Sequence, residues 1–140
     1  MNIEGANQIY QEIAGIINDL IPEEWDKVYL YAEGWKGYST EYFYYYPASG
    51  GEPILSYSIP ERFGLDEEKF EDEEDKLRKL ALSLQQIFLE QGQEQWSNMT
   101  FILESNGKFH TDFDYVDLTE ADPGEQREAW KAKYGIETTN

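Results

Sequence analysis

Apolar side chains recur with helical spacing near the start of the chain. Between residues 7 and 21 they fall on one stripe of a helix. The stripe consists of Ile9, Ile13, Ile16, Ile17 and Leu20. Pro22 follows at once, and because proline lacks a backbone N–H and clashes with the preceding turn, we expect the helix to end before it.

Three segments with the patterns of β-strands come next. Residues 27–33 alternate between apolar residues and tyrosines, residues 41–46 are an aromatic run, and residues 54–59 give a short third strand. The connections are short enough for hairpins, and Gly34 and Gly37 bracket the first of them. The three segments therefore predict an antiparallel meander.

A second helical pattern follows an acidic segment. Residues 66–75 hold eight carboxylates in ten positions, and carboxylates near a helix N-terminus complement the helix dipole. Apolar residues then recur at helical spacing, at Leu77, Leu80, Ala81, Leu84, Ile87 and Phe88. We expect one long helix here, with Gly92 as its stop signal.

A β-hairpin is predicted around residues 99–115, and the pattern fixes its register. The apolar faces of the two strands coincide only if the loop has an odd number of residues. A three-residue loop, 105–107, with Gly107 in the left-handed region, meets this condition. The register then places Leu103 opposite Phe109, Phe101 opposite Thr111, and Met99 opposite Phe113.

The last predicted element is a short helix over residues 125–134. Asp122 is a good N-cap, Pro123 suits the first helical position, and Gly135 is a stop signal. The resulting order is helix, three strands, helix, two strands, helix. It predicts an α+β fold, one domain spanning residues 1–140, with helices packed on an antiparallel sheet.

Composition and charge narrow the function. The chain has 140 residues, 11 basic and 29 acidic side chains, a formal net charge of −18 and no cysteine. This charge repels nucleic acid and anionic lipid and favours basic protein partners. The N-terminus lacks the basic and apolar pattern of a secretory signal, and no apolar stretch approaches the ~20 residues of a membrane span. We therefore expect a cytoplasmic protein that binds neither membrane nor nucleic acid.

Residues capable of catalysis are few. His110 is the only histidine, and it shares an outward strand face with Asp112 and Asp114. Without a second histidine, a cysteine or a nucleophile-bearing motif, a solvated face is favoured over an active site. Asp117 and Pro123 stand where a calcium loop needs glycine and glutamate, so no metal is expected. We predict no enzyme activity and no cofactor.

Aromatic and acidic side chains are the candidates for contact with a partner. Trp25, Trp96, Tyr29 and Tyr115 are expected in the core, with their polar tips at the surface. In the aromatic run, alternate tyrosines should face solvent, where exposed rings anchor interfaces. The predicted partner-binding residues are Tyr42, Tyr44, Tyr46, His110, Asp112, Asp114, Asp117 and Glu120.

Several segments resemble the YezG-like immunity proteins. The likeness begins at residues 9–14 and 21–29, continues at Trp96 and through the hairpin residues 106–108, and extends to later segments. The later segments are Phe113-Asp114-Tyr115-Val116-Asp117 and Lys133-Tyr134-Gly135-Ile136. Together they cover the chain from about Ile9 to Ile136, in the same order and at similar spacing.

The resemblance implies a function that composition alone does not. Members of the family are cytoplasmic antitoxins paired with large toxins of type VII secretion, of the LXG or nuclease kind. The implied role is binding and neutralisation of a toxin's basic C-terminal nuclease domain. Two alternatives stay open: a small acidic enzyme using paired carboxylates such as Asp112 and Asp114, and an adaptor for another basic protein.

Overall fold

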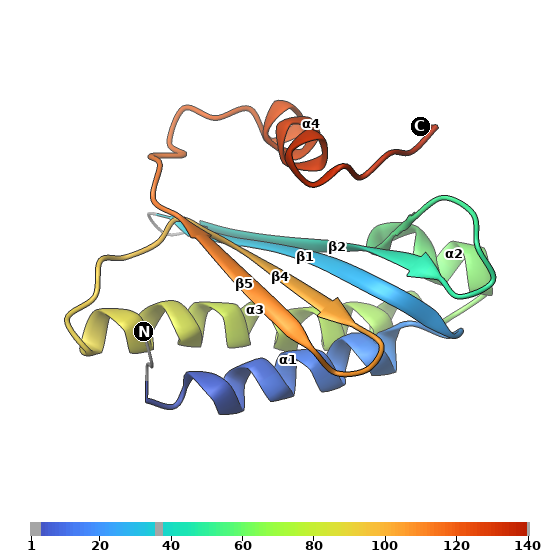
Figure 1. Cartoon of the computed structure of the whole chain (residues 1–140), viewed down its shortest axis with the longest axis horizontal. Helices are drawn as coiled ribbons and strands as arrows, with labels where there is room; N and C mark the ends of the chain where they lie inside the picture. Colours follow the sequence, from blue (N-terminus) through green and yellow to red (C-terminus); the bar gives the residue numbers. More distant parts are fainter. Residues whose placement is uncertain (1–3, 36–37, 140) are drawn as a thin grey trace.

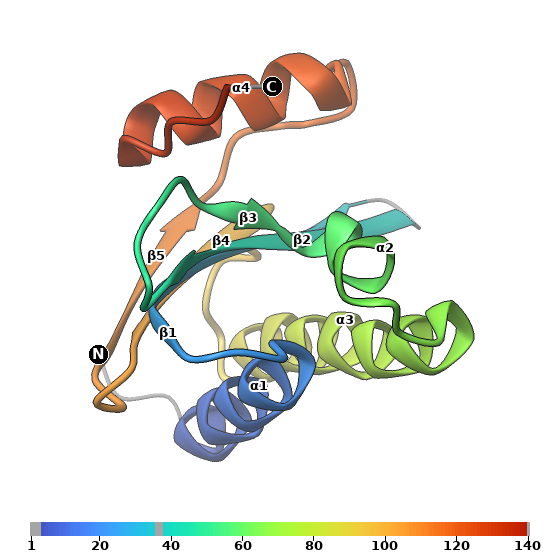
Figure 2. The ribbon, with the colours of Figure 1, turned by 90° about the vertical axis from the view of Figure 1, so that its right-hand side faces the viewer.

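A five-stranded antiparallel sheet forms the middle layer of the protein, as the computed structural model shows for residues 4–35 and 38–139 (Figure 1). Its strand order is β3-β2-β1-β4-β5. The strands are β1 (Trp25–Trp35), β2 (Tyr38–Pro47), β3 (Ile54–Leu55), β4 (Asn98–Glu104) and β5 (Phe109–Asp114). Helices α1 (Ala6–Leu20) and α3 (Glu67–Glu90) cover one face, and α4 (Pro123–Tyr134) lies over the other (Figures 1 and 2). The predicted α+β class and order of elements are confirmed.

The main core lies between the sheet and the pair α1 and α3. The predicted stripe of α1 faces inward, with Ile13 and Ile17 fully buried and Ile16 at the margin. Leu77 and Leu84 of α3 meet the same core, together with Phe43 and other ring side chains of the sheet. Burial of this apolar stripe, at about 25 cal/mol per Å², is what fixes both helices to the sheet.

The long helix α3 begins within the acidic segment, as predicted. The Asp66 carboxylate accepts hydrogen bonds from the backbone N–H groups of Glu68 and Lys69, which makes Asp66 the N-cap. The helix ends at Glu90, two residues before Gly92. Within the described residues, no helix has the length and apolar character needed to cross a bilayer.

The β4–β5 hairpin has the predicted register. Phe101 lies opposite Thr111, and Met99 opposite Phe113. Gly107 adopts a φ of 91°, in the left-handed region, and its N–H bonds to the Glu104 carbonyl. The three-residue loop therefore brings the apolar faces of both strands toward α1 and α3.

The prediction of a strand over residues 54–59 is wrong beyond its first two residues. A 3-10 turn follows at Ser56–Ser58, and α2 occupies Ile59–Phe63. Pro60 near the helix start and Gly64, with a φ of 65° just after its end, favour a short helix over an extended strand. In the first hairpin, Gly34 lies inside β1, whereas Gly37 lies outside the described residues.

A second, smaller core lies under α4. Tyr31 of β1 and Tyr42 and Tyr44 of β2 pack there against Trp130 and Ile136. The expected solvent exposure of Tyr42 and Tyr44 is therefore wrong, because only 6% and 4% of their surfaces remain accessible. Both faces of the aromatic run are buried, since Phe43 and Tyr45 point into the main core.

Three of the four aromatic residues expected in the core pack there at least in part. Trp96 is fully buried, while Trp25 and Tyr29 are partly buried against the two cores. Tyr115 is the exception: it is 44% exposed, because β5 ends at Asp114 and the chain turns away from the sheet.

Candidate partner-binding surface

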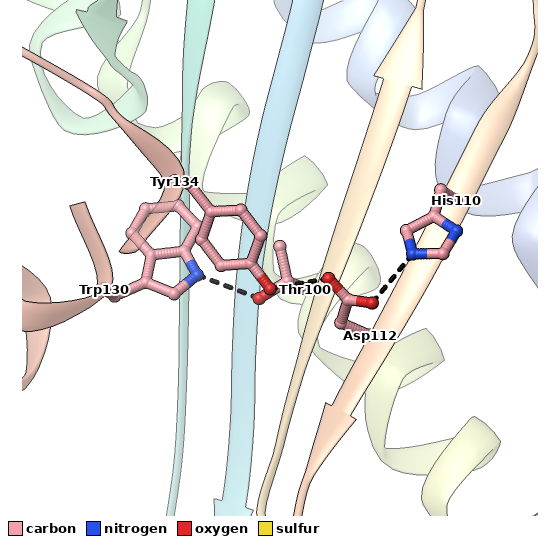
Figure 3. Close-up of polar contacts among 5 residues, drawn as sticks. All are labelled: Thr100, His110, Asp112, Trp130 and Tyr134. Carbon is pink, nitrogen blue, oxygen red and sulfur yellow. Dashed lines mark hydrogen bonds and ion pairs between the residues drawn. The ribbon is translucent and has the colours of Figure 1, made fainter. Parts of the chain in front are cut away.

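The α4 side of β5 carries a connected set of polar side chains (Figure 3). His110 Nε2 lies 2.8 Å from Asp112 Oδ1, and the Tyr134 hydroxyl donates a hydrogen bond of 2.8 Å to Asp112 Oδ2. Tyr134 comes from the last turn of α4, so Asp112 links the sheet edge to that helix. The predicted solvated strand face is thus partly covered.

The contacts of Asp112 favour its ionised form. Partial burial acts to raise its pKa, but the hydrogen bonds from Tyr134 and His110 outweigh this effect, and the pKa is lowered. Burial, and to a smaller extent the same carboxylate, raise the pKa of Tyr134 to about 12. The pair is therefore a fixed negative charge beside a neutral phenol at neutral pH.

The carboxylates that follow shape the connection from β5 to α4. Asp114 Oδ1 accepts the backbone N–H groups of Tyr115 and Val116, at 2.7 and 3.3 Å. Asp117 Oδ1 accepts the N–H of Thr119 at 2.8 Å. Such local turns compete with the extended conformation, and they end the strand.

The far end of this connection is fastened to the sheet. The Trp35 indole N–H donates to Thr119 Oγ1 at 2.9 Å, and Leu118 is buried. The Tyr38 hydroxyl donates to the Leu118 carbonyl at 3.3 Å. Because both ends of the connection are held, the side chains between them are kept in one arrangement.

Two of those side chains are apolar and exposed. Tyr115 is 44% and Val116 51% accessible, and carboxylates flank them at Asp114, Asp117 and Glu120. A cleft of about 170 Å³ adjoins Val116, between β5 and the Trp130 side of α4. An exposed ring with an acidic rim is the composition of a protein-binding surface. We call residues 110–120 on this side the β5–α4 surface.

Sequence reasoning found the acidic part of this surface and missed its apolar part. Asp112, Asp114, Asp117 and Glu120 come together with His110 on and after β5. Strand alternation continued past Asp114 predicts that Tyr115 points into the core. The turn-forming carboxylates at Asp114 and Asp117 are the signal that breaks that alternation.

The predicted tyrosines of β2 do not join this surface. Tyr42 and Tyr44 are buried beneath α4, and Tyr46 packs against Tyr29 with ring centroids 6.2 Å apart. Strands β1 and β4 separate β2 from β5. The predicted set therefore divides into a buried aromatic layer and an exposed acidic surface.

The geometry offers little for bond-making chemistry. His110 is exposed on 69% of its side chain, and its ring contacts a carboxylate already engaged by Tyr134. Among the residues the structure describes, no group of three or more His, Cys, Asp or Glu side chains is arranged to hold a metal ion.

A pair of buried carboxyl groups lies on the other side of the molecule. Glu41 of β2 and Glu74 of α3 each have one carboxyl oxygen, Oε2, that is buried without a hydrogen-bond partner among the described residues. Burial and the neighbouring Glu74 raise the pKa of Glu41 to about 8, and burial and Glu71 raise that of Glu74 to about 7. These groups face the interior, away from the β5–α4 surface. Their ionisation affects the stability of the folded protein.

Similarity to known proteins covers this whole architecture. The family model described as "Immunity protein YezG-like" matches residues 6–137, from the start of α1 to the segment after α4. The chain belongs to the YezG-like immunity protein family. The match includes both the buried aromatic layer and the β5–α4 surface.

Individual relatives align over most of the chain. An immunity protein YezG of Bacillus spizizenii (strain ATCC 23059 / NRRL B-14472 / W23) is 35% identical over 130 residues, which is 92% of this chain and 81% of that protein. One of Bacillus subtilis (strain 168) is 31% identical over 127 residues, 89% and 84% of the two chains. The type VII secretion system protein EsaG of Staphylococcus aureus (strain NCTC 8325 / PS 47) is 32% identical over 123 residues, 87% and 75%.

Proposed function

We propose that this protein protects the cytoplasm of its own cell by binding a toxin of type VII secretion and masking that toxin's basic nuclease domain. The action is protein–protein contact, and no bond is made or broken. Membership of an immunity protein family supports the protective role, and similarity to a protein named for type VII secretion supports the source of the toxin.

The observation that carries the proposal is the β5–α4 surface. A nuclease needs a cationic groove to hold phosphates, and an acidic protein can occupy or cover such a groove. This surface provides carboxylates held by local hydrogen bonds around the exposed Tyr115 and Val116. The formal net charge of −18 adds long-range attraction, which raises the association rate.

The contacts of the polar groups support binding over catalysis. Asp112 is held by two hydrogen bonds, and Asp114 and Asp117 accept backbone N–H groups. Groups fixed in this way present charge to a partner at little further cost in ordering. The alternative of an enzyme with paired carboxylates gains no support from them.

Co-expression tests the function. The probe is the C-terminal domain of the toxin encoded beside the gene for this protein, produced in a host with and without the protein. We expect growth only when both are present, and loss of DNA or RNA cleavage by the purified domain on mixing. Equal killing in both cultures would remove the immunity role, whereas protection with unchanged cleavage would remove only the nuclease target.

Two variants test the surface separately. Glu120→Lys and Val116→Ser change exposed side chains of the β5–α4 surface, and we expect each to weaken toxin binding about tenfold. Glu12→Lys makes the same charge change on α1, on the opposite side of the sheet, and serves as the control. If all three variants bind like the parent protein, the contact lies elsewhere while the immunity function stands.

A further inference from the structure

The outer edge of β5 has backbone groups without partners among the described residues. The Glu104 N–H bonds to the Lys108 carbonyl at 2.8 Å, so residues 108, 110, 112 and 114 direct their backbone groups toward β4. The residues between them alternate, and Phe109, Thr111 and Phe113 direct their N–H and C=O groups away from the sheet. An open edge of this kind is a template for another strand.

The opposite edge of the sheet is partly covered. There, β3 pairs with β2 at two residues, and two hydroxyl groups bond to further backbone groups of β2. The Phe43 N–H donates to Ser56 Oγ at 3.1 Å, and the Tyr57 hydroxyl donates to the Glu41 carbonyl at 2.7 Å. The contrast singles out β5 as the edge available for strand addition.

The side chains along β5 identify the strand that fits. On its α4 side, the order is Lys108, His110, Asp112, Asp114, two basic-type residues followed by two acids. Reversing this order, as an antiparallel partner does, places each basic-type residue opposite an acid. We infer that two copies of this protein associate through antiparallel pairing of their β5 strands about Thr111, which joins their sheets into one.

The pairing satisfies both backbone and side chains. About a two-fold axis at Thr111, Phe109 of one copy meets Phe113 of the other, and Thr111 meets Thr111, as hydrogen-bonded pairs with two bonds each. Between them, His110 lies opposite Asp112, and Lys108 opposite Asp114. The Phe109 and Phe113 rings are partly buried at the main core, so their contact extends that core across the seam.

Neighbouring registers are less favourable. A slip that makes Asp112 the centre puts two Asp112 carboxylates opposite one another. A slip to His110 opposes two His110 rings and leaves Asp114 without a basic-type residue opposite it. Like charges directly across an antiparallel pair are destabilising. The charge order on β5 therefore selects the Thr111-centred register.

Among the described residues, the hydrogen bonds from α4 to β4 and β5 do not use the outward backbone groups of β5. Trp130 donates a hydrogen bond to Thr100 on β4, and Tyr134 donates one to Asp112 on β5. Both side chains therefore lie on the β4 side of β5 and not at its outer edge (Figure 3). The paired segment is 108–114, and the connection 115–122 lies beyond it. The formal charge of −18 on each copy opposes association, so the dimer forms at elevated protein concentration.

Sedimentation equilibrium and amide exchange test the inference on the full chain, without any toxin. From micromolar to millimolar protein, we expect the mass to rise to twice that of the chain. Over the same range, NMR hydrogen exchange at Phe109, Thr111 and Phe113 should slow, while His110 and Asp112, already bonded to β4, change little. A monomer at millimolar concentration, or a dimer in which those three amides still exchange rapidly, overturns the inference.

Matched variants test the charge order. Lys108→Glu places a carboxylate opposite Asp114 at both ends of the paired segment. We expect the dissociation constant of the dimer to rise about tenfold or more. Lys79→Glu makes the same change on α3 and should leave dimerisation nearly unchanged. Thr111→Pro removes the central outward N–H while Thr111→Val retains it, so only the proline variant should be monomeric. Equal dimerisation by Lys108→Glu and Lys79→Glu overturns the register. Protection against the toxin is measured in a separate assay, so that failure of the dimer is distinguished from failure of the proposed function.

Discussion

The indole N–H of Trp130 donates a hydrogen bond of 2.9 Å to Thr100 Oγ1. Both side chains are buried, Trp130 on α4 and Thr100 on the neighbouring face of β4. Trp130 also packs against Tyr31 and Tyr42, with ring centroids 5.5 Å away in each case. One tryptophan therefore supplies both an apolar contact and a directional bond that help to hold α4 on the sheet.

Thr100→Val should loosen this attachment. The substitution keeps the shape of the side chain but leaves a buried indole N–H without an acceptor, at a cost of about 1–3 kcal/mol in the free energy of unfolding. Urea denaturation measures the change. Thr100→Ser, which retains the hydroxyl group, should lose less, and equal losses for the two variants would show that the hydrogen bond contributes nothing.

A close approach of β1 to α3 makes Gly34 sensitive to substitution. A Cβ at this position would lie 2.7 Å from Leu82 Cδ2 and 3.1 Å from Gln85 Oε1. Gln85 cannot yield easily, because its amide donates to the Gly34 and Trp96 carbonyls. We expect Gly34→Ala to cost about 1–3 kcal/mol in thermal or urea unfolding.

Gly15→Ala provides the control for that substitution. Gly15 lies inside α1 and a Cβ there meets nothing within 4 Å. Alanine should stabilise the helix by about 0.5–1 kcal/mol, since glycine carries the greater entropy loss on folding. If both alanine variants shift stability in the same direction, the predicted clash at Gly34 is wrong.

The buried carboxyls make stability depend on pH. The unfolded Glu41 side chain loses its proton near its ordinary pKa of 4.5, whereas the folded protein retains it up to about 8. The folded state thus binds more protons between these values, and the free energy of unfolding falls as the pH rises through them. Across this window we expect a loss of about 5 kcal/mol in the free energy of unfolding, reduced in Glu41→Gln.

Urea unfolding at several pH values measures that slope. Glu12→Gln removes an exposed carboxyl from α1 and controls for the change in net charge. The Glu41→Gln variant should exceed this control in stability most clearly above pH 8. Parallel curves for the two variants would mean that Glu41 ionises freely in the folded protein.

Two phenylalanines of the hairpin should differ in their contribution. Phe101 of β4 is fully buried, and Phe101→Ala should cost about 3–5 kcal/mol. Phe113 of the edge strand packs against Phe88 and Trp96 but stays partly accessible, so Phe113→Ala should cost about 1–3 kcal/mol. Urea unfolding ranks them, and the reverse order would contradict the burial of this hairpin.

Local rules predicted the elements in which local contacts decide the structure. The β4–β5 register followed from one parity condition on the loop, and Gly107 met it with a positive φ. The start of α4 followed from Asp122, whose carboxylate accepts the Glu125 N–H at 2.9 Å. Neither feature depends on distant parts of the chain.

The burial of β2 could not be predicted in the same way. Whether Tyr42 and Tyr44 face solvent depends on a helix more than 75 residues away along the chain, and within α4 itself only Trp130 and Lys131 are buried. The sequence of α4 has almost no apolar stripe, so it does not indicate which face of the helix packs against the sheet. The acidic part of the β5–α4 surface was predictable because strand alternation places it, and Tyr115 was not, because a turn interrupts the alternation.

The aromatic layer beneath α4 also gives the protein a built-in optical reporter. The Trp130 indole lies among the phenol rings of Tyr31, Tyr42 and Tyr44 in fixed orientations, which is the condition for strong near-ultraviolet dichroism. A difference spectrum against Trp130→Phe isolates this chromophore from the other three tryptophans. Any event that lifts the C-terminal helix, whether heat or a docking protein, thereby becomes visible without an added label.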